Sequence, residues 1–456
     1  MTTRREAIGL GLGTLAGLLA GPEALRALGT LPRSIGPSPG LDVALKAARW
    51  IAASRIETKD GIAWPADPAK PESVGTDLYN GMPGVVLFHL ELYRASGDKH
   101  WLDEARLGAN ELISRLPAMA AAGDAGLYTG LAGAAWVIEE VHRATGDGRY
   151  RDHAVRALTL IHTKSERTGN GVAWTGSSAT SDIISGSAGI GLFLLWADAE
   201  IRPGASRDLA LATGKRLLEL GQPSNGGLKW AVAPTVKNLY PNFSHGTAGV
   251  SYFLASLYQV SADRAFLDGA LAGARYLTAV ANTDGDGLKV FHHEPGGESL
   301  FYLSWCHGPA GTSRLFHKFA QVTQDDRWLE MIRRGARATI DSGIPEQRTP
   351  GFWNNISQCC GNCGVGEYFL WLQRIMPNGE YASMVQRVAE DTMRRSTAER
   401  DGLKWIQAEN RVSPDDVVAQ TGYMQGASGV GAFFLHMDSQ AVKKPRAIVW
   451  PDAPSA

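Results

Sequence analysis

The chain has 456 residues, with 45 Lys and Arg against 46 Asp and Glu. Its length fits two or three ordinary domains or one large one, and a hydrophobic content of 44% supports a large core. The balanced charge excludes the general basic field of a nucleic-acid-binding protein, and four cysteines are too few for a disulfide scaffold.

Residues 1–30 resemble an export signal. Arg4 and Arg5 precede an uncharged run at 8–21 that is rich in Gly, Leu and Ala, and a weak cleavage site follows near Ala27. This pattern predicts a twin-arginine signal and a periplasmic or extracellular location. The run is too short to span a bilayer, so we expect no stable membrane insertion after signal removal. The alternatives are a chance Arg pair in a disordered start and a cytoplasmic location.

A Gly-x-x-Gly motif followed by an apolar, helix-like run occurs seven times between residues 40 and 440. The motifs begin at Gly81, Gly130, Gly186, Gly246, Gly308, Gly361 and Gly426. The apolar runs are 85–95, 134–144, 190–199, 250–260, 312–322, 365–375 and 430–437. Because these runs are apolar over much of their circumference, they indicate inner helices packed on several sides.

Amphipathic segments lie between the apolar runs and predict outer helices. They are 44–56, 101–116, 150–164, 206–220, 265–280, 328–341 and 381–399. Seven inner and seven outer helices predict an all-α fold, a closed (α/α)7 toroid that forms a single domain over residues 40–440. Residues 441–456 are then an extended C-terminal tail.

Short β segments are expected in the loops before the inner helices. Similar stretches recur at 61–64, 171–174, 227–230, 287–290 and 402–405, and 351–353 is a shortened version. Most of them end in Trp. These tryptophans either pack the loops or form an aromatic rim around a substrate.

The repeats align the cysteines with one another. The residue before each first glycine is polar or able to bind a metal: Asn80, Thr129, Ser185, His245, His307, Cys360 and Gln425. One residue earlier, Cys306 and Cys359 occupy equivalent places in neighbouring repeats. Cys306, Cys359 and Cys360 should therefore converge at the mouth of the central cavity. Three thiols suit Zn²⁺ with an open fourth position; free or disulfide-bonded cysteines are the alternative.

Cys363 occupies the third position of its motif, where the other repeats have Pro, Ala or Ser. It is therefore interpreted as a small packed residue, and a redox pair with Cys360 is the competing interpretation. His307 directly follows Cys306, and it is a further possible metal ligand.

These motifs together resemble the lanthionine synthetase C-like family from about Ala44 to about Asp438. Ser304-Trp305-Cys306-His307-Gly308 matches the motif of the first zinc ligand, and Cys359-Cys360-Gly361 matches a three-thiolate variant of the second. His245 in His-Gly-Thr-Ala-Gly matches the catalytic histidine, and Asp182 matches the catalytic aspartate. Two positions depart from the family pattern, because His307 replaces a Tyr and Tyr302 replaces an Arg.

The resemblance implies a Zn²⁺-dependent enzyme that adds a cysteine thiol to a dehydroamino acid and forms a thioether. It implies a peptide or small-thiol substrate. His245, Asp182 and His307 are the candidate catalytic residues, with His245 as the acid that protonates the enolate carbon. Cys306, Cys359 and Cys360 are the implied zinc ligands.

Two other functions remain open at this point. The toroid could bind zinc and a thiol or peptide without turnover. It could also be a carbohydrate-active enzyme that uses Asp77 and Asp182 as acid and base. The sequence does not predict an oligomeric state.

Overall fold

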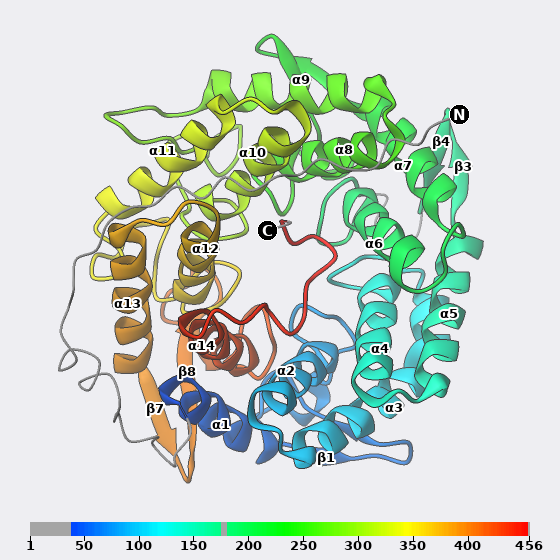
Figure 1. The fold of residues 1–456 in the computed structure, drawn as a ribbon, viewed down its shortest axis with the longest axis vertical. Coiled ribbons are helices and arrows are strands. Elements are labelled where there is room, and N and C mark those ends of the chain that lie inside the picture. Colours follow the sequence, from blue (N-terminus) through cyan, green and yellow to red (C-terminus); the bar gives the residue numbers. More distant parts are fainter. Residues whose placement is uncertain (1–37, 175–179, 455–456) are drawn as a thin grey trace, which may run out of the picture. The chain divides into compact units, whose positions relative to one another are not determined.

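The computed structural model describes residues 38–174 and 180–454, and these form one compact unit. Within this described part, 14 α-helices are arranged as a ring (Figure 1). None of these helices is long and apolar enough to cross a membrane. The expected signal at 1–30 lies outside the described residues.

Seven inner helices surround the centre of the ring, as the repeats predict. They are α2 (Met82–Ser96), α4 (Leu131–Thr145), α6 (Ser187–Glu200), α8 (Thr247–Ser261), α10 (Pro309–Thr323), α12 (Asn362–Ile375) and α14 (Ala427–Ala441). Each begins directly after the first glycine of its motif. The residues of the first three turns are buried almost without exception, which explains why these helices are apolar on several sides.

The outer helices are α1 (Pro39–Ala52), α3 (Lys99–Ala122), α5 (Gly148–Thr163), α7 (Arg207–Leu220), α9 (Arg264–Val280), α11 (Arg327–Asp341) and α13 (Gly379–Arg394). Each inner helix packs on the outer helix that follows it in the chain. The last inner helix, α14, packs instead on α1 and so closes the ring (Figure 1). A closed ring leaves no repeat without a neighbour on either side.

Two of the outer helices were predicted to extend too far. The segments 44–56 and 381–399 were expected to be helical throughout, but α1 ends at Ala52 and α13 ends at Arg394. Ile56 lies in strand β1 (Ile56–Glu57), and residues after Arg395 form strand β7 (Ser396–Glu399). Both strands pair antiparallel with the strand that follows, and this pairing replaces the last helical turn.

The loops hold short antiparallel sheets at most of the predicted places. They are formed by β1 with β2 (Ile62–Ala63), β3 (Glu166–Thr168) with β4 (Gly171–Ala173), β5 (Gln222–Ser224) with β6 (Gly227–Lys229), and β7 with β8 (Gly402–Ala408) and β9 (Val417–Ala419). The segment 287–290 forms only an isolated bridge, between Asn282 and Lys289.

The tryptophans that follow these strands mostly pack the loops. The indole Nε1 of Trp174, Trp230 and Trp405 donates to the carbonyl oxygen of Ile161, Leu217 and Thr392, respectively, near the end of the preceding outer helix. These hydrogen bonds satisfy carbonyl groups that a helix end leaves without a partner. Trp353 differs because it lines a cavity near the cysteines.

A circle of backbone hydrogen bonds joins the seven repeats at the centre. The N–H donors and carbonyl acceptors are, in order, Tyr79 to Tyr128, Tyr128 to Ile184, Ile183 to Ser244, Ser244 to Cys306, Cys306 to Cys359, Cys359 to Met424 and Met424 to Tyr79. The N···O distances lie between 2.8 and 3.1 Å. The circle places Cys306 directly beside Cys359, although they are far apart in the sequence.

The second glycine of each motif allows this close approach. A Cβ atom added at Gly311 would lie 2.0 Å from the carbonyl oxygen of Trp305, and one added at Gly364 would lie 2.1 Å from that of Gln358. The same clash, with the carbonyl oxygen six residues earlier, recurs in other repeats. Only glycine therefore lets the helix start pack against the turn that carries the polar residues.

Candidate metal centre and active site

Five of the six predicted site residues line a cavity of about 460 Å³, which we call the cysteine cavity, and the sixth, Asp182, lies behind His245. Its lining is Tyr79, Ile184, Val232, Val236, Tyr240, His245, His292, Tyr302, Cys306, His307, Trp353, Cys359, Cys360, Glu409, Asn410, Arg411 and Gln425. These residues come from the turns before the inner helices and from the loops above them. Asn80, Thr129 and Ser185, which were expected at the same mouth, are not among the lining residues.

The three predicted ligand cysteines come together. The Sγ atom of Cys360 lies 3.3 Å from that of Cys306 and 3.4 Å from that of Cys359, and all three lie within 4.8 Å of one another. A Zn–S bond of about 2.3 Å in tetrahedral geometry places sulfur atoms roughly 3.8 Å apart. The cluster therefore has the size and the donor type that a tetrahedral, thiolate-bound metal requires.

The pKa values of the buried thiols diverge. Burial acts to raise the pKa of Cys359, but hydrogen bonds from Cys306, Cys360 and Tyr79 bring it well below its usual value. Burial and the neighbouring Cys359 raise the pKa of Cys306. Without a cation, one thiol of the cluster thus loses its proton readily, and deprotonation of a second thiol is unfavourable. A bound divalent cation would offset the repulsion and favour all three thiolates.

The second predicted group, Asp182 and His245, forms a hydrogen-bonded pair. Asp182 is fully buried, and its Oδ2 lies 2.5 Å from Nδ1 of His245. Its Oδ1 accepts from the backbone N–H of Ser185 (3.1 Å), so the carboxylate is fixed in its own turn. Because Nδ1 binds Asp182, Nε2 is the nitrogen left for a ligand in the cavity.

The aspartate also changes the protonation of His245. Burial acts to lower the pKa of His245, but the hydrogen bond and charge of Asp182 raise it above its usual value, with a contribution from Cys359. The imidazole is therefore biased towards its protonated form at neutral pH. A protonated imidazole facing the cavity is suited to act as a general acid.

His307 has the opposite character. It is 6% exposed and packs against the rings of Tyr240, His292 and Tyr302. Burial, together with His292, lowers its pKa well below the usual value, so it is neutral at neutral pH. Within the described part of the chain, the cysteine cluster that could hold a metal does not include it.

The structure separates the other candidates from the cluster. Cys363 is fully buried, carries a free thiol and lies outside the cluster, as expected of a small packing residue. Asp77, the proposed acid or base of a carbohydrate-active site, accepts backbone hydrogen bonds from Asn80 and Gly81 within its own turn. It is not among the residues that line the cysteine cavity.

Several lining residues were missed by sequence reasoning. Tyr79 occupies the same repeat position as Cys306 and Cys359, so the alignment of repeats could have found it. It lies beside Cys359 and accepts a hydrogen bond from Nε2 of Gln425 (2.8 Å). Arg411 and His292 lie in the loops between the short β segments and the inner helices, and no recurring sequence signal pointed to them.

The fold and the site together define an α/α toroid with a cluster of three cysteine thiols at its centre. The structure of nisin cyclase is similar, with 16% identity, a TM-score of 0.63, and 90% of this chain and 96% of that chain covered. The GH76A α-1,6-mannanase from Salegentibacter sp. HEL1_6 has 12% identity and a TM-score of 0.47, over 88% of this chain and 99% of that one. Among curated proteins, none matches the sequence significantly.

The family follows from the sequence match. The model of the lanthionine synthetase C-like proteins matches residues 72–453. The chain belongs to this family. Its ring of inner and outer helices is the fold that the resemblance in the motifs led us to expect.

Proposed function

We propose that this protein binds Zn²⁺ through Cys306, Cys359 and Cys360 and catalyses thioether formation, by adding a thiol to a dehydroamino acid. The observation that carries the proposal is the convergence of three thiols and His245, which Asp182 holds by a hydrogen bond, on one cavity. The substrate class is a peptide or a small thiol. Membership of the lanthionine synthetase C-like family supports this chemistry.

The reaction needs a deprotonated thiol and a proton donor. A zinc ion with a free fourth position would act as a Lewis acid and keep the substrate thiol deprotonated at neutral pH. The thiolate sulfur then forms a bond to the β-carbon of the dehydroamino acid, and the electron pair of the C=C bond moves towards the carbonyl group. The α-carbon must finally receive a proton.

The chain's own residues can supply the proton that the α-carbon receives. Protonated His245, held by Asp182, donates from Nε2 to the α-carbon of the enolate. His307 is neutral because burial lowers its pKa, and the same shift makes it a weak base. It can accept a hydrogen bond from the substrate, while the proton of the substrate thiol is released to solvent. The two imidazole rings lie 5.7 Å apart between centroids, close enough to share one substrate between them.

The test combines metal analysis with a thiol-addition assay. Purified protein is expected to contain one zinc per chain and to add a cysteine-containing peptide to a dehydroalanine-containing acceptor, with a product of the summed mass. Protein without stoichiometric zinc overturns the metal site. Protein with zinc that binds thiols but forms no product supports the alternative of a non-catalytic thiol-binding toroid.

Export remains a separate proposal, which depends on Arg4 and Arg5. Cell fractionation of the protein and of a variant with Arg4→Lys and Arg5→Lys tests it. We expect the unchanged protein outside the cytoplasm and the variant inside it, because twin-arginine recognition reads the arginine pair. Both proteins in the cytoplasm would contradict the proposal.

A further inference from the structure

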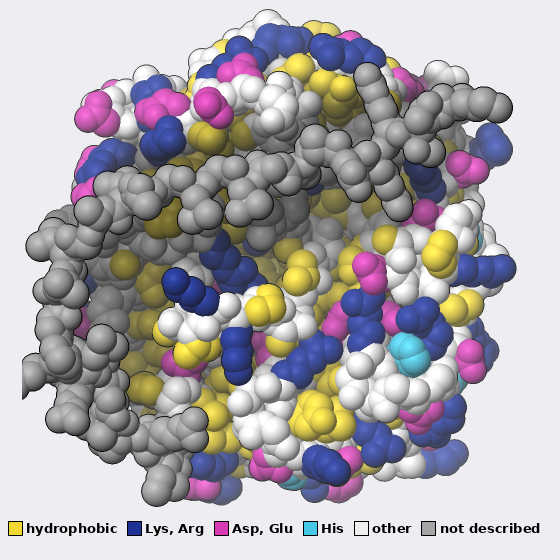
Figure 2. Space-filling view, viewed as in Figure 1, with side chains coloured by type: hydrophobic (Ala, Val, Ile, Leu, Met, Phe, Trp, Pro, Cys, Tyr) yellow, Lys and Arg dark blue, Asp and Glu magenta, His cyan; other side chains and the backbone are white. Residues whose placement is uncertain are grey.

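The C-terminal segment 445–454 lies inside the ring. It leaves the end of α14 and crosses the centre, where Figure 1 shows it surrounded by the inner helices. Ile448 and Asp452 are 2% and 1% exposed. A cavity of about 260 Å³ lies between this segment and the inner helices, and we call it the tail cavity. Figure 2 shows the same face hollowed towards the centre, with Lys and Arg side chains near the hollow.

The tail cavity and the cysteine cavity meet at the backbone circle. Trp305 and Gln358 line the tail cavity, while the residues that follow them, Cys306 and Cys359, line the cysteine cavity. The two cavities share no lining residue. The segment therefore lies directly behind the cysteines, separated from them by one layer of residues.

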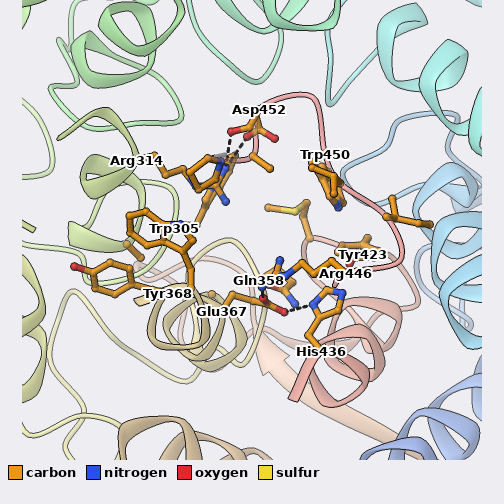
Figure 3. Close-up of a pocket in the computed structure, with 18 of the residues that line it drawn as sticks. Trp305, Arg314, Gln358, Glu367, Tyr368, Tyr423, His436, Arg446, Trp450 and Asp452 are labelled. Carbon is orange, nitrogen blue, oxygen red and sulfur yellow. Dashed lines mark hydrogen bonds and ion pairs between the residues drawn. The ribbon is translucent and has the colours of Figure 1, made fainter. Parts of the chain in front are cut away.

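Polar contacts attach the segment at two places. Near its start, Arg446 forms an ion pair with Glu367 of α12, which also binds His436 (Figure 3). Near its end, Asp452 Oδ2 accepts from Nη1 of Arg314 in α10 (3.0 Å) and from the hydroxyl of Tyr128 (3.0 Å). Asp452 therefore binds two residues that belong to distant repeats.

Both partners of Asp452 contact Trp305. The guanidinium of Arg314 lies 5.9 Å from the centre of the Trp305 ring. The ring of Tyr128 lies 5.2 Å from it between centroids. Trp305 directly precedes Cys306, whose N–H donates to the carbonyl of Cys359. The carboxylate of Asp452 therefore orders two groups that contact the indole of Trp305. Because Cys306 is the next residue in the chain, the position of Trp305 also affects the backbone of Cys306.

We propose that Asp452 is a positioning residue for the metal centre. Through Arg314 and Tyr128 it fixes Trp305, and thereby the backbone from which the Sγ atom of Cys306 extends. The inference rests on the metal site proposed above, because it concerns a ligand of that site. Groups bonded directly to a metal ligand typically change metal affinity by about 10 to 100-fold when they are removed, so for Asp452, which acts through intervening residues, we expect the lower end of this range.

The experiment uses the full chain loaded with Co²⁺, whose absorption bands report the geometry of thiolate ligands. Asp452→Asn keeps the shape of the side chain and removes its charge, and Asp452→Ala removes both. We expect shifted cobalt bands and release of the metal to a chelator about tenfold faster than from the unchanged protein. The matched control is Arg446→Gln, which removes the ion pair near the start of the segment. Among the described residues, no hydrogen bond, ion pair or ring contact joins Arg446 to Trp305.

The outcomes separate the two proposals. The control is expected to lose some thermal stability but to keep the cobalt spectrum and release rate. Cobalt-loaded Asp452 variants with an unchanged spectrum and release rate overturn this inference and leave the metal site standing. Unchanged protein that takes up no cobalt overturns the metal site, and this inference with it. If Asp452→Ala does not fold, Asp452→Asn decides alone.

Discussion

The two cavities at the centre of the ring are built from the same repeats but differ in how their polar groups are paired. In the tail cavity, the carboxylates of Glu367 and Asp452 each meet a guanidinium, so the charges are balanced within the chain. In the cysteine cavity, the three thiols have mainly one another and Tyr79 as partners. The metal that we propose would act at this difference, because a bound cation beside the three thiols would balance the negative charge that their deprotonation adds.

The largest expected effect comes from removing a thiol of the cluster. Cys306→Ala or Cys359→Ala should lower zinc affinity by more than about 100-fold, because loss of a ligand should exceed the effect of losing a neighbour that orients one. Thiol addition should be lost with the metal. Zinc content by mass spectrometry of the metal and the thiol-addition assay measure both.

Cys363→Ala is the matched control for these variants. It also removes a buried thiol, but one outside the cluster, so it should keep one zinc per chain. Loss of zinc from this control, or full zinc retention in Cys306→Ala, would contradict the assignment of the ligands.

The next effect separates proton transfer from metal binding within the cysteine cavity. His245→Asn should lower the rate of thiol addition by roughly 10²- to 10⁴-fold, the usual contribution of a general acid. Asp182→Asn should act in the same direction, because it removes the charge that raises the pKa of His245. Both variants should retain zinc. If these variants lose zinc as well as activity, the Asp182–His245 pair instead stabilises the cysteine cluster.

A smaller effect concerns the charges of the tail cavity. The pKa of His436 is about 9 because, against burial, Glu367 and Glu91 favour its protonated form. A raised pKa in the folded state stabilises the protein fully below the ordinary value of 6.5, and this stabilisation is lost as the pH rises through 9. The loss should be on the order of 3 kcal/mol in the free energy of unfolding.

Denaturant unfolding of the protein and of His436→Gln at several pH values measures this contribution. The difference between the two should be largest below pH 6.5 and shrink towards pH 9. Glu367 behaves in the opposite way. Against the effect of burial, Arg446 and His436 lower its pKa to about 2. Its contribution to stability is therefore present above the ordinary value of 4.5 and is lost as the pH falls from 4.5 through about 2. A pH-independent difference would exclude the ionised cluster.

The smallest effect is expected for Arg446→Gln. The ion pair of Arg446 with Glu367 is partly buried, but Glu367 keeps His436 as a partner when the arginine is lost, so the loss should cost about 1 to 2 kcal/mol of stability. The rate of thiol addition should not change, because Arg446 lines the tail cavity and is not among the lining residues of the cysteine cavity. If Arg446→Gln changes the rate of thiol addition while its zinc content stays the same, residues other than Asp452 also couple the tail cavity to the cysteine cavity.

The internal repeats explain how much of the fold could be predicted. Equivalent positions in seven copies gave the inner helices, the closeness of the three cysteines, and the separation of Cys363 from them. The ends of α1 and α13 could not be predicted. The amphipathic pattern of each helix continues past its last residue, but the residues that follow pair as strands with a later segment. The closing contact of α1 with α14 is likewise a property of the whole ring.

The parts of the site that lie outside the repeats were not predictable. Arg411 lies between β8 and β9, and its place in the cavity depends on how that hairpin folds over the ring. His292 shares its loop with His293, with no equivalent elsewhere. Asp452 belongs to a tail without helical or strand periodicity, so only its contacts with Arg314 and Tyr128 reveal its location.

The backbone circle has a consequence for how the site could be altered. Its hydrogen bonds use only main-chain groups, so the ring closes equally with Ile184, Ser244, Tyr79 or Met424 at these positions. A side chain can therefore be exchanged there without removing a bond from the circle. Ile184 already borders the cysteine cavity. Replacing it with a metal-binding residue is thus a direct way to ask how many donor atoms the centre accepts, while the scaffold stays constant.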